Sequence, residues 1–236
     1  MTLLSPVLSD ALNPALSGGT GAAPEQRYFT TFQGTNSHHI QFPDISLPTD
    51  SEWEVTVVAA VPDQGAYLLA DRLNSDGQSR FGLLNDGRTF GLSDEISAIG
   101  GDTMGLKGGN KLRVMKAVAD SGNINVTINS TLVHSYGVGN STPVLNSIGR
   151  QYNGQTGVPP MMGVISLVQI EKAGILVLDM PINQEYTPSN NTVLDLSGQG
   201  NHGTFVGIED GDSKLYTQNE NGDWVSGEET LGGINN

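Results

Sequence analysis

The sequence contains no cysteine, which excludes disulfide bonds, thiolate catalysis and cysteine-ligated zinc. Basic residues are also few, with 11 Lys and Arg against 25 Asp and Glu and a formal net charge of −14. A chain of this charge is repelled by the phosphates of nucleic acids and by anionic membranes. We therefore expect no nucleic-acid partner, and the acidity by itself favours solubility.

Long hydrophobic runs are absent as well. No segment approaches the roughly 20 apolar residues that a membrane span needs, so we expect no membrane insertion. Residues 1–6 have neither the basic start nor the apolar stretch of a signal peptide. Together with the lack of cysteine, this predicts folding in a reducing cytoplasm without a signal peptide.

Glycine is abundant, at 31 of 236 residues, and short alternating segments separated by turn residues follow one another from residue 27. The clearest early segment places Trp53, Val55, Val57 and Ala59 on one face, whereas residues 164–170 are apolar on both faces and predict a central strand. We expect strands at residues 28–33, 38–42, 52–61, 66–70, 80–84, 89–92, 111–119, 123–129, 131–135, 144–149, 164–170, 175–182, 214–217 and 223–225. About a dozen strands without a helix predict an all-β, two-sheet antiparallel β-sandwich.

The densest glycine stretch, residues 193–204, is here named the Gly-rich corner. Glycines occur where φ must be positive or where two backbones touch, and the flanking residues are of β type. We therefore expect two strand ends joined by a tight polar turn. Its structural residues are Asp195, Ser197, Gly198, Gly200, Asn201, His202 and Gly203.

The pattern Asp-x-Ser-Gly-x-Gly-Asn-His-Gly-Thr at residues 195–204 resembles laminin-G-like, concanavalin-A-like jelly-roll domains. Residues 28–40 resemble the opening strand of the same domains. The corner follows the last long strand instead of preceding the opening strand, and this order, ending in Asn-Gly-Asp-Trp-Val at residues 221–225, is similar to proteins of tailed-bacteriophage virions. The resemblance covers residues 27–225 and implies a jelly roll carried on a virion.

The first 26 residues differ from the rest, because Pro6 and Pro14 prevent one continuous helix and a Gly/Ala/Pro linker follows. Its apolar residues are Leu3, Leu4, Val7, Leu8, Leu12 and Leu16. We expect an arm and linker at 1–26, the sandwich at 27–227 and a flexible tail at 228–236. The arm is either a disordered tail or, as we hypothesise, an assembly arm that docks on a neighbouring subunit or on the particle.

Catalysis by a glycosidase would require two carboxylates about 5–5.5 Å apart for retention. The nearest candidates are Asp94 with Glu95, Glu52 with Glu54, and Glu228 with Glu229. The first pair points to opposite faces of a strand, the second shares a face but is followed by no third acid, and the third lies in the tail. There is also no Gly-x-Ser-x-Gly elbow. We expect no catalytic residue and no enzyme.

Metal ligands are sparse. His38 and His39 alternate across a strand, so that one should face outward, and four scattered histidines do not make a zinc site. Calcium is the only candidate cofactor, with Asp195, Asn201, Asp210 and Asp212 as candidate ligands. The alternative, which we favour, is that Asp195 and Asn201 hydrogen-bond their own turn. His202 is expected to be a packed corner residue.

Binding of glycans would require exposed aromatic faces, for which Tyr152, Tyr136 and Trp224 are the candidates. The sequence and the resemblance together predict a non-enzymatic structural protein on the surface of a tailed-phage virion, either a capsid decoration or a tail-fibre and receptor-binding protein. Its partners would be other virion proteins, further copies of the chain and host surface glycans. The alternatives are a free carbohydrate-binding lectin and, less favoured, a polysaccharide-degrading enzyme.

Overall fold

A computed structural model of the chain describes residues 24–33, 38–48, 50–60, 67–70, 82–84, 89–90, 112–137, 144–149, 162–221, 223–227 and 229–231. These residues form strands, turns and loops, and all strand pairs are antiparallel. None of them belongs to a helix long and apolar enough to cross a membrane.

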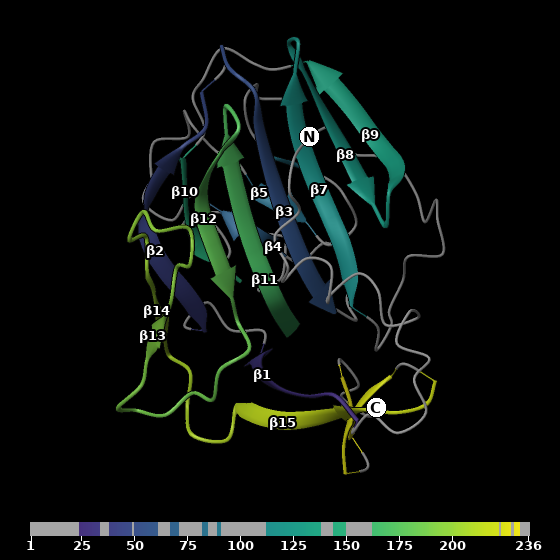
Figure 1. Cartoon of the computed structure of the whole chain (residues 1–236), viewed down its shortest axis with the longest axis vertical. Coiled ribbons are helices and arrows are strands. Elements are labelled where there is room, and N and C mark those ends of the chain that lie inside the picture. Colours follow the sequence, from purple (N-terminus) through teal and green to yellow (C-terminus); the bar gives the residue numbers. More distant parts are fainter. Residues whose placement is uncertain are drawn as a thin grey trace.

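The strands form two sheets, and the larger one faces the viewer in Figure 1, with β10, β4 and β5 of the smaller sheet behind it. The larger sheet contains β1 (Gln26–Gln33), β3 (Trp53–Ala60), β7 (Arg113–Asp120), β8 (Asn123–Ile128), β9 (Thr131–Gly137), β11 (Met162–Lys172), β12 (Ile175–Pro181), β15 (Ser213–Gln218), β16 (Trp224–Ser226) and β17 (Glu229–Thr230). The smaller sheet contains β2 (His39–Ser46), β4 (Tyr67–Ala70), β5 (Gly82–Leu84), β6 (Thr89–Phe90), β10 (Val144–Ile148), β13 (Thr192–Val193) and β14 (Gly203–Val206).

The order of the larger sheet is β17-β16-β15-β1-β11-β3-β7-β8-β9, and that of the smaller sheet is β13-β14-β2-β10-β4-β5-β6. Strand β11 is central, as predicted: β3 pairs along one side, while β1 and β12 share the other. The all-β, two-sheet antiparallel sandwich predicted from the alternation is therefore confirmed.

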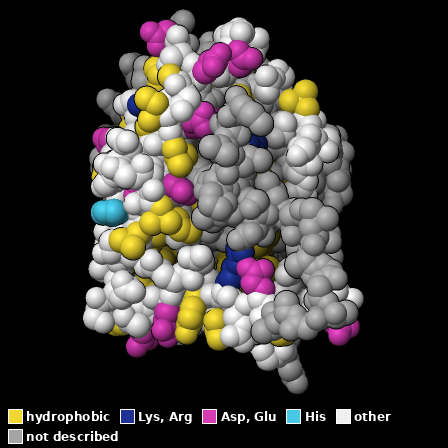
Figure 2. Space-filling view, in the orientation of Figure 1, with side chains coloured by type: hydrophobic (Ala, Val, Ile, Leu, Met, Phe, Trp, Pro, Cys, Tyr) yellow, Lys and Arg dark blue, Asp and Glu magenta, His cyan; other side chains and the backbone are white. Residues whose placement is uncertain are grey.

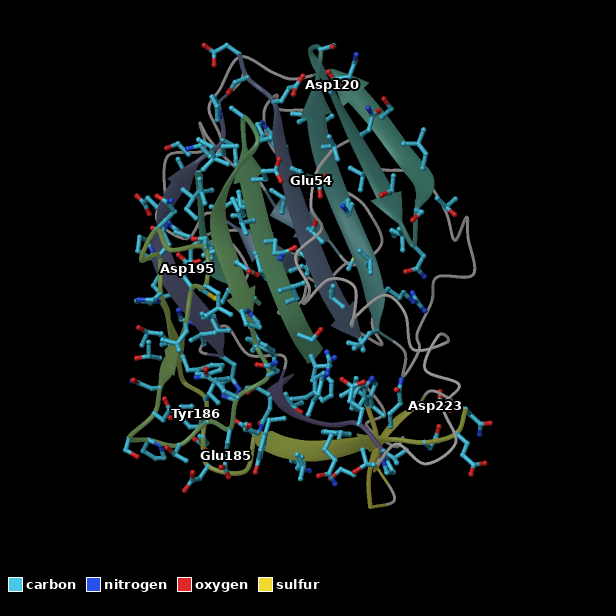
Figure 3. The ribbon with its side chains drawn as sticks, in the orientation of Figure 1. Glu54, Asp120, Glu185, Tyr186, Asp195 and Asp223 are labelled. Atoms are coloured by element: carbon cyan, nitrogen blue, oxygen red, sulfur yellow. The ribbon has the colours of Figure 1, made fainter. Side chains whose placement is uncertain are left out.

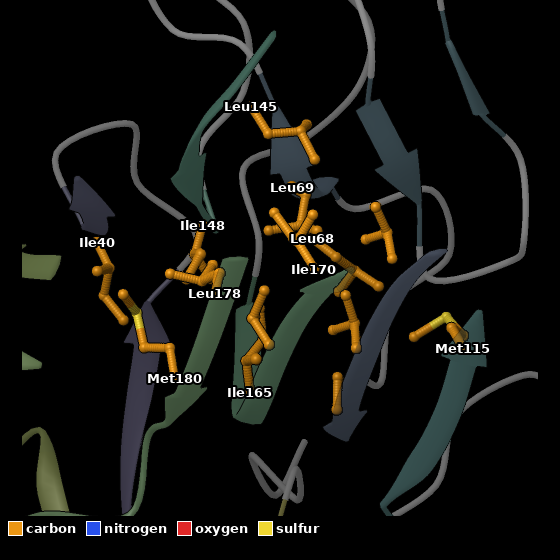
Figure 4. Close-up of a cluster of buried hydrophobic side chains, with 14 of the residues drawn as sticks. Ile40, Leu68, Leu69, Met115, Leu145, Ile148, Ile165, Ile170, Leu178 and Met180 are labelled. Atoms are coloured by element: carbon orange, nitrogen blue, oxygen red, sulfur yellow. The ribbon is translucent and has the colours of Figure 1, made fainter. Parts of the chain in front are cut away.

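The main core lies between the two sheets (Figure 4). Trp53, Val55, Val57 and Ala59 point into it from β3, as their alternation predicted, and each is at most 2% exposed. Opposite them, Leu68, Leu69, Leu145 and Ile148 come from the smaller sheet. Each fully buried aliphatic side chain of this kind contributes about 1.5–3 kcal/mol through removal from water.

A bulge in β11 keeps core-facing side chains of this strand directed into the main core. The partners shift between Ile165 and Leu167, so Ser166 is the extra residue. The Ser166 carbonyl accepts a hydrogen bond from Ile182 N at 2.9 Å. As a result Ile165 and Val168 both face the main core, although residues three positions apart on a regular strand would face opposite sides.

A second, smaller core packs β1, β3 and β11 against the C-terminal strands. Phe29 contacts Tyr216 and Trp224 edge to face, with ring centroids 5.6 and 5.2 Å apart. Leu231 is fully buried in this cluster, and its N–H donates to the Trp224 carbonyl at 2.8 Å. The expected tail at 228–236 is therefore wrong at its start, because β17 and Leu231 belong to the fold.

At two positions the backbone passes so close to a buried side chain that only glycine, which has no Cβ, fits. A Cβ on Gly203, the first residue of β14, would lie 2.6 Å from Cγ2 of Ile40. A Cβ on Gly149 would lie 2.7 Å from the Phe32 ring, and its φ of +80° also favours glycine. Gly203 therefore brings the Gly-rich corner close to the main core.

Candidate functional site

The Gly-rich corner is organised by the carboxylate of Asp195, which is 5% exposed. Its Oδ1 accepts hydrogen bonds from the backbone N–H groups of Asp179 and Ser197 at 2.9 and 3.0 Å. Its Oδ2 accepts from Ser197 Oγ at 2.8 Å and from Asn201 N at 2.9 Å. Four donors converge on one buried carboxylate, and Gly198 and Gly200 take φ values of +81° and +76° in the turn that brings them there.

These hydrogen bonds set the ionisation of Asp195. Burial raises the pKa of the carboxyl group, but the hydrogen bonds from Asp179, Ser197 and Asn201 favour the charged form and together outweigh burial. The pKa of Asp195 therefore lies below its ordinary value, and the carboxylate is ionised at neutral pH.

The corner also seals the edge of β12. This strand pairs with β11 on one side, and on its other side the backbone groups of Val177 and Asp179 bond to the corner. Asp179 N donates to Asp195 Oδ1, Leu196 N donates to Asp179 O at 2.7 Å, and Asn201 Nδ2 donates to Val177 O at 2.8 Å. Because β13 and β14 belong to the smaller sheet, the corner joins that sheet to the edge of the larger one. Figure 3 shows Asp195 at this edge.

His202 completes the corner by accepting a hydrogen bond, but its side chain is exposed, so the expectation that it is packed is wrong. Its Nδ1 accepts from Asp195 N at 2.9 Å, so in the neutral ring the proton is on Nε2. We predict that His202→Ala lowers the free energy of unfolding by about 1 kcal/mol, the usual contribution of one hydrogen bond. His202→Asn places an acceptor Oδ1 at the same branch point and should retain most of the stability. Chemical denaturation of both variants tests this, and equal losses would show that the Nδ1 contact contributes nothing.

The candidate calcium ligands are not brought together as a set. Asn201 N donates to Asp195 Oδ2 within the turn, as in the favoured alternative, and Asn201 Nδ2 also bonds to β12, which was not predicted. Asp212 is buried and accepts from Glu209 N at 2.8 Å and from Gln33 Nε2, whereas Asp210 is exposed. In the part of the chain that the structure describes, no three His, Cys, Asp or Glu side chains are grouped so that they could hold a metal ion.

The aromatic candidates for sugar stacking have different positions. Trp224 is 5% exposed and packs on Phe29, so the prediction that it presents a face to sugar is wrong. Tyr136 lies in β9, and its side chain is outside the described part, as is all of Tyr152. The arm residues Leu3 to Leu16, and with them Asp94, Glu95 and Glu228, also lie outside the described residues.

The two adjacent histidines are both buried, which corrects the prediction that one faces outward. His38 is 9% exposed and His39 is 1% exposed. His39 is the first residue of β2 and His38 directly precedes it, and both side chains are covered at this end of the strand. Which elements cover each histidine is decided by tertiary packing, and two adjacent residues in the sequence do not reveal it.

A depression of about 240 Å³ lies at the end of the larger sheet where β3 begins, β7 ends and the β11–β12 turn closes. We name it the rim depression. It is lined by Glu52, Trp53, Glu54, Val118, Ala119, Asp120, Glu171, Ala173 and Gly174. Figure 2 shows Asp and Glu side chains gathered at the top of this face, and Figure 3 shows Asp120 and Glu54 there.

Strand pairing brings a third acid to the Glu52–Glu54 pair. Glu171 of β11 is the direct cross-strand partner of Glu54 of β3. Glu54 Oε1 accepts hydrogen bonds from Lys116 Nζ at 2.6 Å and from Thr56 Oγ1 at 3.0 Å. No third acid follows Glu52 and Glu54 along the strand, and the one beside them comes from a different strand. Its partner is 117 positions away, and the sequence carried no sign of this register.

The rim depression has the chemistry of a polar binding surface. Its four carboxylates accept hydrogen bonds and donate none when ionised, so they suit ligands rich in hydroxyl or amino donors. Lys116 adds a cation beside Glu54, and both side chains are about one-third exposed, so this ion pair adds at most about 1 kcal/mol to stability.

No model of a known protein family matches the sequence, and a search of curated proteins found no match. Solved structures do resemble it. One is a Bacteroides ovatus protein to which carbohydrate binding has been provisionally assigned, with 13% identity and a TM-score of 0.53 over 83% of this chain and 60% of that one. This chain has the same fold.

A second similar structure is the LG4–5 domain pair of the mouse laminin α1 chain, with 11% identity and a TM-score of 0.36 over 64% of this chain and 43% of that one. The chain thus spans less than two thirds of either structure, and the jelly-roll β-sandwich fold is what the likeness to the Bacteroides protein shows.

Proposed function

We propose that the chain is a non-enzymatic carbohydrate-binding β-sandwich and that the rim depression receives the sugar. The observation that carries the proposal is the convergence of Glu52, Glu54, Asp120 and Glu171 in one hollow of about 240 Å³. Sugar hydroxyls are hydrogen-bond donors, and four acceptor groups from three strands and the adjoining segment can bind several of them. The fold supports the proposal by analogy with the Bacteroides protein.

The charge of the depression defines the class of glycan. Four carboxylates line it, and only one of them, Glu54, is paired with a cation in the described part of the chain, so neutral and amino sugars are favoured. Sulfated and sialylated glycans would place an anion against four carboxylates and are disfavoured. Calcium is not needed in this account, because the acceptors contact the sugar directly.

A glycan array probed with the full chain, with and without Ca²⁺, tests the proposal. Neutral or amino glycans should bind, and Glu171→Ala should weaken binding about five-fold, the effect of one lost hydrogen bond. The matched control is Glu185→Ala, because Glu185 is exposed near the other end of the molecule (Figure 3). Absence of binding to any neutral or amino glycan would overturn the proposal, and release of reducing sugar would indicate a hydrolase instead.

Display on a tailed-phage virion is the second part of the proposal. It rests on the order of the sequence motifs and on the leucine-bearing residues 1–26. In this account the arm binds other virion proteins or further copies of the chain, and the sandwich faces host glycans. Removal of residues 1–23 should abolish co-purification with particles while leaving the sandwich folded. A truncated chain that still co-purifies would contradict the role of the arm.

A further inference from the structure

Strand β12 has one more residue than β11, with which it pairs, in the stretch between the rim depression and the Gly-rich corner. Glu171 pairs with Leu176 and Ile170 pairs with Leu178, so Val177 is a bulge residue. Beyond the bulge, Lys172 pairs with Ile175, and the chain reverses through Ala173 and Gly174. Their φ values of +47° and +77° are those of a two-residue type I′ turn.

This turn forms one wall of the rim depression. Ala173 and Gly174 both line it, together with Glu171 from the same hairpin. The Ala173 N–H donates to the Glu52 carbonyl at 2.9 Å and ties the turn to the start of β3. If the bulge at Val177 were lost, β12 would slip by one residue and the two-residue turn would no longer fit. The shape of this wall therefore depends on the position of the bulge.

Asn201 holds the bulge from the opposite side. Its Nδ2 donates to the Val177 carbonyl at 2.8 Å, and its own N–H donates to Asp195 Oδ2 at 2.9 Å. Asp195 is in turn attached to β12 through Asp179 N. The side chain of Asn201 thus bonds to the one residue of β12 that has no cross-strand partner in the β11–β12 hairpin.

We propose that Asn201 is a positioning residue for the rim depression: by binding the Val177 carbonyl it fixes the β12 bulge and thereby the Ala173–Gly174 turn that walls the depression. The proposal deepens the glycan-binding function and rests on it for its consequence in affinity. Its structural part, the placement of the turn, stands separately.

The test compares two corner variants by nuclear magnetic resonance and by glycan titration. Asn201→Ala removes the bond to Val177. Ser197→Ala is the matched control, because Ser197 Oγ bonds to Asp195 Oδ2 and Gln199 N but not to β12. We expect Asn201→Ala to shift the amide resonances of Glu171, Ala173 and Gly174 and to weaken glycan affinity about five-fold. Ser197→Ala should leave these amides in place and change affinity less than two-fold.

Asn201→Asp serves if the alanine variant does not fold, because it keeps the size and the backbone bond and replaces the donor by a charged acceptor that cannot bond to the Val177 carbonyl. Unchanged amides of Ala173 and Gly174 in both Asn201 variants would overturn the proposal, whatever happens to binding. Amide resonances that shift in Asn201→Ala but not in Ser197→Ala would support it. If those amides shift and the wild-type chain binds no glycan, the proposed function fails and the positioning role of Asn201 remains.

Discussion

Asp195→Ala should lower the free energy of unfolding by about 3–5 kcal/mol, one of the two largest losses that we expect. The substitution removes an acceptor of four hydrogen bonds, and each bond to a charged group contributes about 1.5–3 kcal/mol without full additivity. It also leaves the Asp179 N–H at the edge of β12 without its acceptor. Urea denaturation followed by tryptophan fluorescence measures the loss.

The matched control for this substitution is Asp210→Ala. Asp210 is exposed in a neighbouring turn, so its removal should change stability by less than about 0.5 kcal/mol. A loss below 1 kcal/mol in Asp195→Ala would contradict the account of the Gly-rich corner.

The same carboxylate makes the free energy of unfolding depend on pH in the acid range. The pKa of Asp195 is lowered in the folded chain, so its contribution is complete above the ordinary pKa of an aspartate, about 3.9, and is lost as pH falls through the folded pKa. Below about pH 4 the wild type should therefore lose up to about 1.4 kcal/mol per pH unit more than Asp195→Asn. Parallel pH profiles of the two proteins would contradict this prediction.

Trp224→Ala should be as damaging, with a loss of about 3–5 kcal/mol. Trp224 is 5% exposed, packs on Phe29 and has the Arg27 guanidinium 5.6 Å from its ring centre. Its truncation opens a cavity in the second core, where Leu231 is fully buried. Thermal and urea unfolding of the variant measure the loss.

Leu215→Ala is the control for the second core, because Leu215 lies in β15 but is 41% exposed. It should cost well under half as much as Trp224→Ala. If both substitutions cost the same small amount, the C-terminal strands would add little to the fold, and residues 228–236 would behave as the tail that the sequence predicted.

Local alternation was sufficient to predict the fold class and the position of most described strands. Residues 124–128 alternate cleanly because one face of β8 is buried and the other is not, whereas in residues 53–59 Thr56 and Val58 are buried as well. The hairpin turns at Ser121–Gly122 and Asn129–Ser130 have positive φ at both positions, which Gly122 and Asn129 favour and the two serines do not. Short strands gave less information, since the three residues of β16 are too few to show that Trp224 faces inward.

The candidate site depended on information that local patterns do not contain. The corner residues were predicted as a unit, but their partner, the edge of β12, was not. The rim depression depends on the register that sets Glu171 opposite Glu54 and on a bulge at Val177. Register between strands far apart in sequence is chosen by the summed packing of both faces, so no single segment reveals it.

The central claim is that the Gly-rich corner closes the edge of β12 and joins the two sheets there. Native-state hydrogen exchange of the Asp179 amide tests it most directly, with the Val57 amide in the middle of the larger sheet as reference. We predict that the two amides exchange at comparable rates, both through global unfolding. An Asp179 amide that exchanges as fast as the amide of an exposed loop residue such as Ser189 would show that the edge is open and would contradict the claim.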